Sequence, residues 1–209
     1  MYLYDFVRLF PENDKSLLRL TYKKEVVFCD RVDYLQFNKD GMLDPICNSH
    51  VAFWYVEHNP IDPTAANRTT DGKHIIVPNI MDIVLDDMDV NPKYRYFNDI
   101  PDNNIKLKDL LDKSAWVWST YVELIGEMDG EDSTDLFKTS ELFSHMKTGK
   151  SKKKIHLPQD VYNRKVLGLD LSFYYIDPEK TKPDVTGKYT EPKPRLSIIL
   201  EGSLLDGND

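Results

Sequence analysis

A stretch rich in glycine and lysine comes closest to a known binding motif. Residues Ser144 to Ser151 read Ser-His-Met-Lys-Thr-Gly-Lys-Ser, a phosphate-binding loop in which serine replaces the first glycine. Such a loop wraps phosphate in backbone amides, and the positive end of the helix that follows adds to the binding. Here a helix is expected before the loop, and Pro158 follows it. The pattern therefore favours a helix end with a solvated basic run over a nucleotide site.

The cysteines and histidines match no common metal-binding pattern. Cys29, Cys47, His50 and His58 could supply four zinc ligands, but their spacing, C-x17-C-x2-H-x7-H, belongs to no common zinc module. His50 and His58 would lie too far apart on one strand to share a metal without a bend. The expectation is two free, buried thiols, two histidines at strand ends, no metal and no cofactor.

Two acidic clusters offer carboxylates of the kind that hold calcium or magnesium. They are Asp86-Asp87-Met88-Asp89 and the segment from Glu127 to Asp132. Neither has the spacing of an EF-hand loop. The second cluster is also what a solvated turn before a helix would contain, because carboxylates favour a helix N-terminus.

Signatures of catalysis are absent from the sequence. There is no G-x-S-x-G, H-E-x-x-H or C-x-x-C. Five histidines (His50, His58, His74, His145, His156) and many carboxylates could still meet in space. An enzyme with a dispersed site therefore stays the third hypothesis for this chain.

The charge of the chain is negative overall and unevenly distributed. Its 209 residues carry a formal net charge of −8, which suits poorly a surface-wide grip on a phosphate backbone. Acidic residues gather between Asp82 and Asp135, and basic residues between Lys138 and Lys165. Such segregation suits docking on a charged partner or head-to-tail self-association. Two solvated faces are the alternative.

The ends and the composition favour a soluble chain made in the cytoplasm. Residues Met1 to Asp5 lack the basic and apolar regions of a signal peptide. The longest apolar runs, such as Val51–Val56, are too short to cross a bilayer. We expect a cytoplasmic protein, with a virus particle as a further possible location.

A long C-terminal hairpin is the clearest structural signal. It joins strands Val166–Asp177 and Arg195–Asp206, and its first strand alternates apolar and polar residues with the period of two typical of a half-buried strand. The other expected elements are helices at 3–10, 31–37, 107–111 and from Ser133 or Thr134 to Lys147; strands at 16–22, 25–30, 50–58, 74–77, 80–85, 116–125 and 154–157; and a turn at 126–132. A helix from Lys108 competes with the strand at 116–125. The sequence shows no internal repeat.

These elements predict an α+β fold of mainly antiparallel strands with a few short helices, closed by the hairpin at 166–206. Residues 1–85 are expected to form an N-terminal α+β unit and residues 86–104 an acidic linker. Residues 105–209 are expected to form a mainly antiparallel C-terminal unit.

The loop of the hairpin, residues 178–194, is the first candidate for a partner-binding segment. It is longer than hairpin loops usually are, and its prolines lower the entropy cost of docking. A mobile surface loop is the alternative. The candidate partner-binding residues are Lys180, Lys182, Pro183, Lys188, Tyr189, Pro192 and Lys193 of this loop, Lys150, Lys152, Lys153 and Lys154 of the basic run, and Asp86, Asp87 and Asp89 of the first acidic cluster.

These features favour a non-enzymatic structural or assembly protein that packs against copies of itself or other subunits. A phage or virus particle component, such as a connector or tail ring subunit, is one hypothesis. The alternative is a soluble acidic inhibitor or binding module from a mobile element, because an acidic surface mimics a phosphate backbone and blocks a basic site on a host enzyme. Direct contact of the basic run with nucleic acid is the less favoured option, and no membrane partner is expected.

Overall fold

The computed structural model shows an α+β fold dominated by strands, as the sequence predicts. The residues that it describes are 1–12, 14–36, 43–57, 68–77, 79–88, 93–96, 99–101, 104–115, 121–128, 131–138, 142, 159–171, 174–183, 185–188 and 196–204.

Five short helices and ten strands make up the described structure. The helices are α1 (Leu3–Val7), α2 (Asp33–Gln36), η1 (Pro45–Asn48), α3 (Leu107–Asp112) and η3 (Gln159–Asn163). The strands are β1 (Leu17–Tyr22), β2 (Glu25–Arg31), β3 (Val51–Val56), β4 (Ile75–Val77), β5 (Ile80–Leu85), β6 (Tyr121–Met128), β7 (Glu131–Lys138), β8 (Val166–Asp170), β9 (Tyr174–Ile176) and β10 (Leu196–Glu201).

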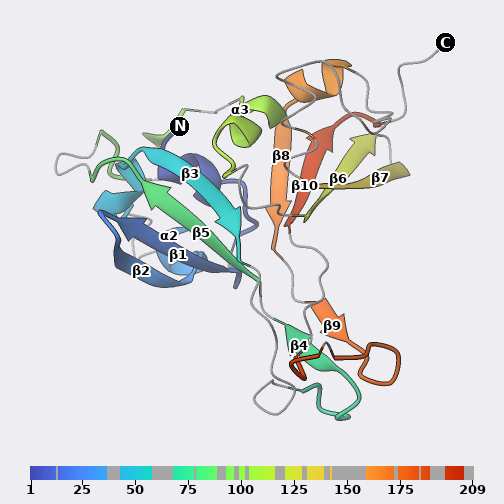
Figure 1. Ribbon diagram of the computed structural model, residues 1–209. Coiled ribbons are helices and arrows are strands. Elements are labelled where there is room, and N and C mark those ends of the chain that lie inside the picture. The colour runs from blue at the N-terminus through green and yellow to red at the C-terminus, as the bar shows by residue number, and fades with distance from the viewer. Residues whose placement is uncertain are drawn as a thin grey trace.

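The strands form two four-stranded sheets and one two-stranded arm (Figure 1). The first sheet has the order β2-β1-β5-β3 and the second the order β7-β6-β10-β8. Each sheet has one parallel pair at its centre, β1 with β5 and β6 with β10, and its other pairs are antiparallel. Strands β4 and β9 pair with each other and project from the two sheets.

The first hairpin shows how the local sequence specifies a strand pair. In β1 the buried Leu18 and Leu20 alternate with the half-buried Arg19 and Thr21, so only one face enters the core. Lys23 and Lys24 form the two-residue turn with φ values of 48° and 70°. Positive φ at both central residues matches the twist of a tight hairpin.

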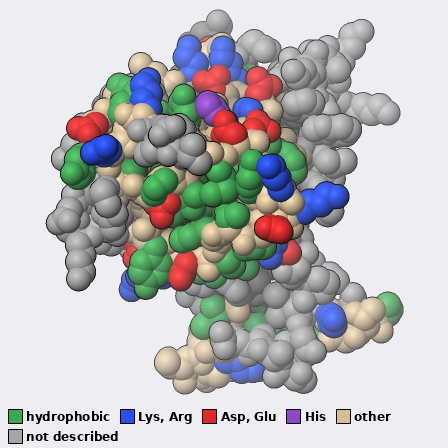
Figure 2. Space-filling view, turned by 90° about the vertical axis from the view of Figure 1, so that its left-hand side faces the viewer, with side chains coloured by type: hydrophobic (Ala, Val, Ile, Leu, Met, Phe, Trp, Pro, Cys, Tyr) green, Lys and Arg blue, Asp and Glu red, His purple; other side chains and the backbone are tan. Residues whose placement is uncertain are grey.

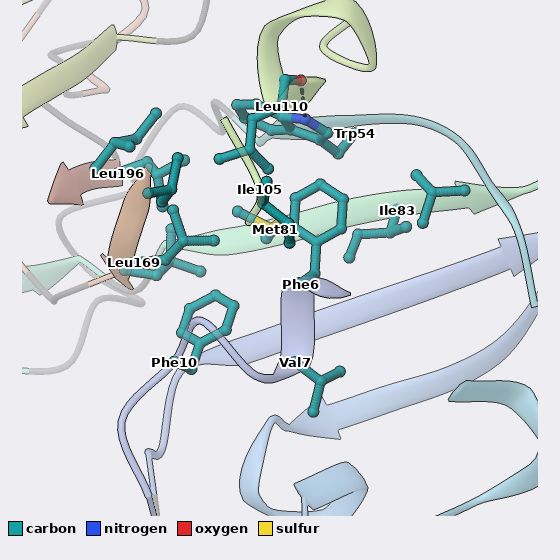
Figure 3. Packing of buried hydrophobic residues seen from close by; sticks show 14 of the residues in the cluster. Phe6, Val7, Phe10, Trp54, Met81, Ile83, Ile105, Leu110, Leu169 and Leu196 are labelled. Carbon is teal, nitrogen blue, oxygen red and sulfur yellow. Dashed lines mark hydrogen bonds between the residues drawn. The ribbon is translucent and has the colours of Figure 1, made fainter. Parts of the chain in front are cut away.

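One hydrophobic cluster extends beneath both sheets. Helices α1 and α3 contribute Phe6 and Leu110 to it, and both lie beside Trp54 of the first sheet (Figure 3). Leu169 of the second sheet belongs to the same cluster. The cluster therefore joins the regions predicted as N-terminal and C-terminal units. Each four-stranded sheet comes from one of these regions, and the boundaries of the units stay a prediction.

The helix expected from Ser133 or Thr134 to Lys147 is wrong for residues 133–138, which belong to β7. The turn expected at 126–132 is also shorter, because β6 runs on to Met128 and β7 begins at Glu131. The hydrogen bonds that β7 makes to β6 decide this segment, and tertiary pairing of this kind overrides local propensity. The helix that competed for residues after Lys108 ends at Asp112.

The long first strand of the C-terminal hairpin is divided in the structure. Strand β8 pairs antiparallel with β10, as the hairpin predicts. After Asp170 the chain leaves that sheet, and β9 pairs with β4 instead. Alternation continues across the division, so the sequence pattern alone could not reveal it. The strand expected at 154–157 lies outside the described residues.

Candidate functional site

The outer face of the first sheet is the candidate functional site. Leu18, Leu20, Trp54, Met81 and Ile83 point into the core, so the residues between them point outward. The pairing registers place Arg19 beside Asp82 and Asp82 beside Tyr55, and place Thr21 beside Val84 and Val84 beside Phe53. We call these outward side chains, together with Cys29 and Val26 of β2, the first-sheet face.

Large hydrophobic side chains are exposed on and around this face. Val26 is 57% exposed, Val27 37% and Phe53 37%, and the neighbouring Tyr34 of α2 is 56% exposed. Figure 2 shows hydrophobic side chains gathered at the centre of the view, with charged side chains around them. The rings of Phe53 and Tyr55 are stacked at an interplanar angle of 23°, with centroids 6.4 Å apart. Contiguous apolar surface of this kind is typical of a protein interaction site.

An ion pair between the partly exposed Arg19 and the buried Asp82 lies on the first-sheet face. The Arg19 guanidinium donates through Nε and Nη2 to the two carboxylate oxygens of Asp82, and Nη2 also donates to Glu57 at 2.8 Å. Asp82 is only 3% exposed although it lies on the outer side of the sheet. The two-pronged geometry holds both side chains in one arrangement and gives the apolar face a rigid polar centre.

Burial and pairing act in opposite directions on the acid of this pair. Loss of solvent raises the pKa of Asp82 above its ordinary value, although hydrogen bonds and charge from Arg19 act to lower it. The same contacts raise the pKa of Arg19, so the guanidinium stays charged. Burial also raises the pKa of Tyr55. The shift of the Asp82 pKa is therefore toward neutral pH, whereas the shifts of Arg19 and Tyr55 are away from it.

A second feature is a cleft of about 610 Å³ between α1 and α3. Its lining combines aromatic and charged side chains: Met1, Tyr2, Tyr4, Asp5, Lys93, Tyr94, Pro101, Asn104, Ile105, Asp109, Asp112 and Lys113. Tyr2 stacks on Tyr4 at 5.1 Å, and Tyr4 meets Tyr94 edge-on. Asp5 and Asp109 accept hydrogen bonds from the backbone at the start of each helix. The cleft thus lies between the two helix starts, and two of its carboxylates, Asp5 and Asp109, have structural roles.

Part of the first acidic cluster is engaged in contacts within the chain. The Asp87 carboxylate accepts from the backbone N–H of His50 at 2.7 Å and lies 2.9 Å from the Nδ1 of the same residue. Asp86 is exposed, and Asp89 lies outside the described residues. In the second cluster, Glu127, Glu131 and Asp132 belong to strands, so the solvated turn before a helix is not found there.

The loop residues that the structure describes lie beside the arm. Lys180, Lys182, Pro183 and Lys188 are all exposed after β9, and Lys180 pairs with Asp177 at 3.0 Å. The structure does not bring them to the first-sheet face of the same chain (Figure 1). Tyr189, Pro192, Lys193 and Lys150, Lys152, Lys153 and Lys154 lie outside the described residues, as do His58, His145 and His156.

The four proposed zinc ligands are not assembled into a site by the described structure. Cys29 is exposed on β2, which corrects the expectation of a buried thiol, and Cys47 is fully buried. Both are free, and burial raises the pKa of Cys47. Among the described residues no three His, Cys, Asp or Glu side chains come together as metal ligands would.

Sequence reasoning missed the first-sheet face itself. Phe53, Arg19 and Asp82 come from three strands, and only the strand order brings them together. The available signal was the charge and aromatic character of positions facing away from the core in β1, β3 and β5.

Comparison with known proteins gives no further guide: no protein-family model, no curated protein and no solved structure matches the chain. Within the described residues no helix has the length and apolar character that crossing a membrane requires.

Replacing Asp87 with alanine is expected to cost about 1 kcal/mol or less at neutral pH, because the lost hydrogen bonds are largely solvent-exposed. Hydrogen bonds from His50 lower the pKa of Asp87 below its ordinary value. The carboxylate therefore stabilises the fold above its unfolded-state pKa and loses this effect as pH falls through the folded-state pKa. Urea unfolding at neutral and acidic pH measures the difference, with Asp86→Ala as the control. A deficit that grows on acidification would contradict the assignment.

Proposed function

We propose that this chain is a non-enzymatic assembly protein that acts by packing against other protein subunits, including copies of itself. The observation that carries the proposal is the first-sheet face, with exposed Phe53 and Val26 around the Arg19–Asp82 pair. Exposed aromatic and apolar side chains beside an arginine are typical of the residues that contribute most to protein binding. A phage or virus particle, for example its connector or tail ring, is one setting for such a subunit.

The second sheet shows that the fold itself does not demand aromatic side chains at the outward positions of this strand. Strand β8 is bonded to β10 as β3 is to β5, and it carries Gly168 and Asp170 at the outward positions. Asp170 is exposed. A large exposed aromatic residue such as Phe53 costs solubility without adding to the core, so a role in binding accounts for it.

Replacing Phe53 with aspartate is expected to weaken association about 10- to 100-fold, because burying a phenylalanine side chain is worth about 1.5–3 kcal/mol. The matched control is Leu167→Asp, since Leu167 is 43% exposed on β8 of the second sheet. Light scattering over a range of concentrations, alone and with co-purified subunits, measures the mass. Thermal unfolding checks that both variants stay folded.

Equal association of wild type and Phe53→Asp, with both folded, would exclude the first-sheet face as the binding surface. A chain that remains monomeric at high concentration and retains no subunit would contradict the assembly role altogether.

A further inference from the structure

The two four-stranded sheets repeat one arrangement of strands. In each sheet a hairpin supplies the outer two strands, β2-β1 or β7-β6. A later strand, β5 or β10, pairs parallel with the inner strand of that hairpin. The last strand of the sheet, β3 or β8, is antiparallel to it. A helix precedes each hairpin, α1 in one case and α3 in the other, and the chain order is the same in both.

The registers of the parallel pairs agree residue by residue. Leu18 pairs with Met81 in the first sheet, and Val122 pairs with Leu196 in the second. Four positions further on, Tyr22 pairs with Leu85 and Gly126 with Leu200. Each residue of β1 therefore matches the residue of β6 that lies a fixed number of positions later in the chain, and the same holds for β5 and β10.

The antiparallel pairs agree as well, including their irregularity. Trp54 is opposite Ile83, and Leu169 is opposite Ile198. Both ladders contain a register shift one step further along, before Val51–Leu85 in one sheet and before Val166–Leu200 in the other. A bulge is a specific local device, so its recurrence at the matching place is hard to explain by chance.

The starts of the two helices are built alike. The N–H of Tyr2 donates to Asp5, and the N–H of Lys106 donates to Asp109. The next N–H of each helix reaches the residue two positions before the last strand of its sheet: Leu3 donates to Ser49 O at 2.9 Å, and Leu107 to Arg164 O at 3.1 Å. Isolated bridges join Tyr2 to His50 and Lys106 to Lys165.

The contacts between the two halves are reciprocal. The backbone N–H of Trp54 donates to Lys113 O just after α3. The backbone N–H of Leu169 donates to Leu9 O just after α1, and both distances are 2.8 Å. Contacts in which i meets j and j meets i are the mark of an isologous, two-fold interface.

We infer that the chain is two copies of one structural unit in tandem, Met1 to Asp86 and Ile105 to Glu201. The surface between them is an isologous subunit interface, whose partner is a second copy of the same unit. The first-sheet face proposed above lies outside this interface, so each of the two proposals can fail without the other.

The interior and the surface have diverged differently between the two units. Matching core positions are apolar and buried in both: Leu3 and Leu107, Phe6 and Leu110, Val7 and Leu111, Leu18 and Val122, Leu20 and Leu124, Val51 and Val166, Trp54 and Leu169, Val56 and Leu171, Met81 and Leu196, Ile83 and Ile198, Leu85 and Leu200. On the outer face, by contrast, Phe53 matches Gly168 and Arg19 matches Glu123. The core positions serve the shared fold, and the outer positions are free to serve a function in one unit.

The first unit carries both partners of the reciprocal contact. In a pair of first units, the Trp54 backbone N–H of each copy would donate to Leu9 O of the other copy, as the Leu169 N–H donates to Leu9 O within the chain. These two reciprocal hydrogen bonds use backbone groups only, so they can form between identical units.

The test begins with the full chain, carrying a protease site between Asp102 and Asn103 and cut after purification. We expect both pieces to elute together at the mass of the uncut chain, and to reassemble when diluted from urea. After separation in urea, residues 1–102 refolded alone are expected to form a dimer by light scattering. Separation of the pieces on cutting would overturn the inference. So would a first piece that stays monomeric or unfolded at concentrations at which the cut chain reassembles.

Val26→Lys separates this interface from the first-sheet face. Pairing of two first pieces is expected to persist in this variant, because β2 lies at the opposite edge of the first sheet from β3, whose Trp54 makes the reciprocal contact. Loss of pairing in the folded variant would show that the first pieces associate through the first-sheet face, and would overturn the inference.

Discussion

Replacing Trp54 with alanine is expected to lower the free energy of unfolding by about 3–5 kcal/mol, the range for large-to-small substitution of a buried aromatic residue. The Trp54 side chain is fully buried, and its ring meets Phe6 edge-on with centroids 6.0 Å apart. Its indole N–H donates to Leu110 O at 2.9 Å, which ties the first sheet to α3 (Figure 3). Removal leaves a cavity and a carbonyl without this donor. Denaturant unfolding of wild type and variant measures the loss.

Two further variants separate packing from hydrogen bonding at this position. Trp54→Phe retains most of the packing and is expected to lose about 1–2 kcal/mol, mainly from the missing donor. Phe53→Ala, at the adjacent and partly exposed position, is expected to change stability by about 1 kcal/mol or less. A loss as small for Trp54→Ala as for Phe53→Ala would show that Trp54 does not hold the two halves together.

Replacing Arg19 with methionine is expected to destabilise the chain by about 2–3 kcal/mol at neutral pH. Removing one partner of a buried ion pair costs about 3–5 kcal/mol, and the partial exposure of Arg19 reduces this. The cost arises because Asp82 stays buried without the guanidinium that pairs it. Urea unfolding at neutral pH measures the deficit.

The pH dependence of the Arg19→Met deficit has a definite sign. Burial already raises the folded-state pKa of Asp82 above its unfolded-state value, so the folded state takes up a proton first as pH falls. Without Arg19 that pKa rises further. The deficit should therefore shrink as pH falls through the folded-state pKa of Asp82. A deficit that stays constant or grows on acidification would show that the loss does not come from the unpaired carboxylate.

A double variant isolates the pair itself. Arg19→Met with Asp82→Leu removes both charges and is expected to recover most of the stability lost by Arg19→Met alone, because apolar side chains of similar size can replace a buried ion pair at little cost. Association of this double variant then tests whether the polar centre of the first-sheet face contributes to binding. A double variant less stable than the single one would contradict the assignment.

Local patterns determined most of the individual elements. The spacing of Leu3, Phe6 and Val7 predicts α1, and the alternation in Ser16–Tyr22 predicts β1. In both cases one face of the element is apolar, and the need to bury that face acts within a few residues. The α+β class of the fold and the pairing of β8 with β10 follow from the same patterns.

Pairing between distant segments determined what the sequence could not. Residues 133–138 carry a possible helix start, yet they form β7 because β6 offers a strand to pair with. The run Val166–Asp177 keeps its alternation throughout, yet its end, β9, pairs with β4 and not with β10. Folding brings β4 next to β9, and the alternation does not record this. A period of two shows which residues share a face and says nothing of which strand lies beside them.

The internal repeat is the clearest case of this division. The sequence determined that Leu3 and Leu107, or Ile83 and Ile198, are apolar, and no more is needed at a core position of a shared fold. Few other positions match, so the sequence shows no repeat. Only the tertiary structure brought the matching registers, helix starts and reciprocal hydrogen bonds into view, because these belong to the backbone, which many sequences can form. The structure likewise decided that Arg19, Asp82 and Phe53 meet on one face, since strand order sets these neighbours.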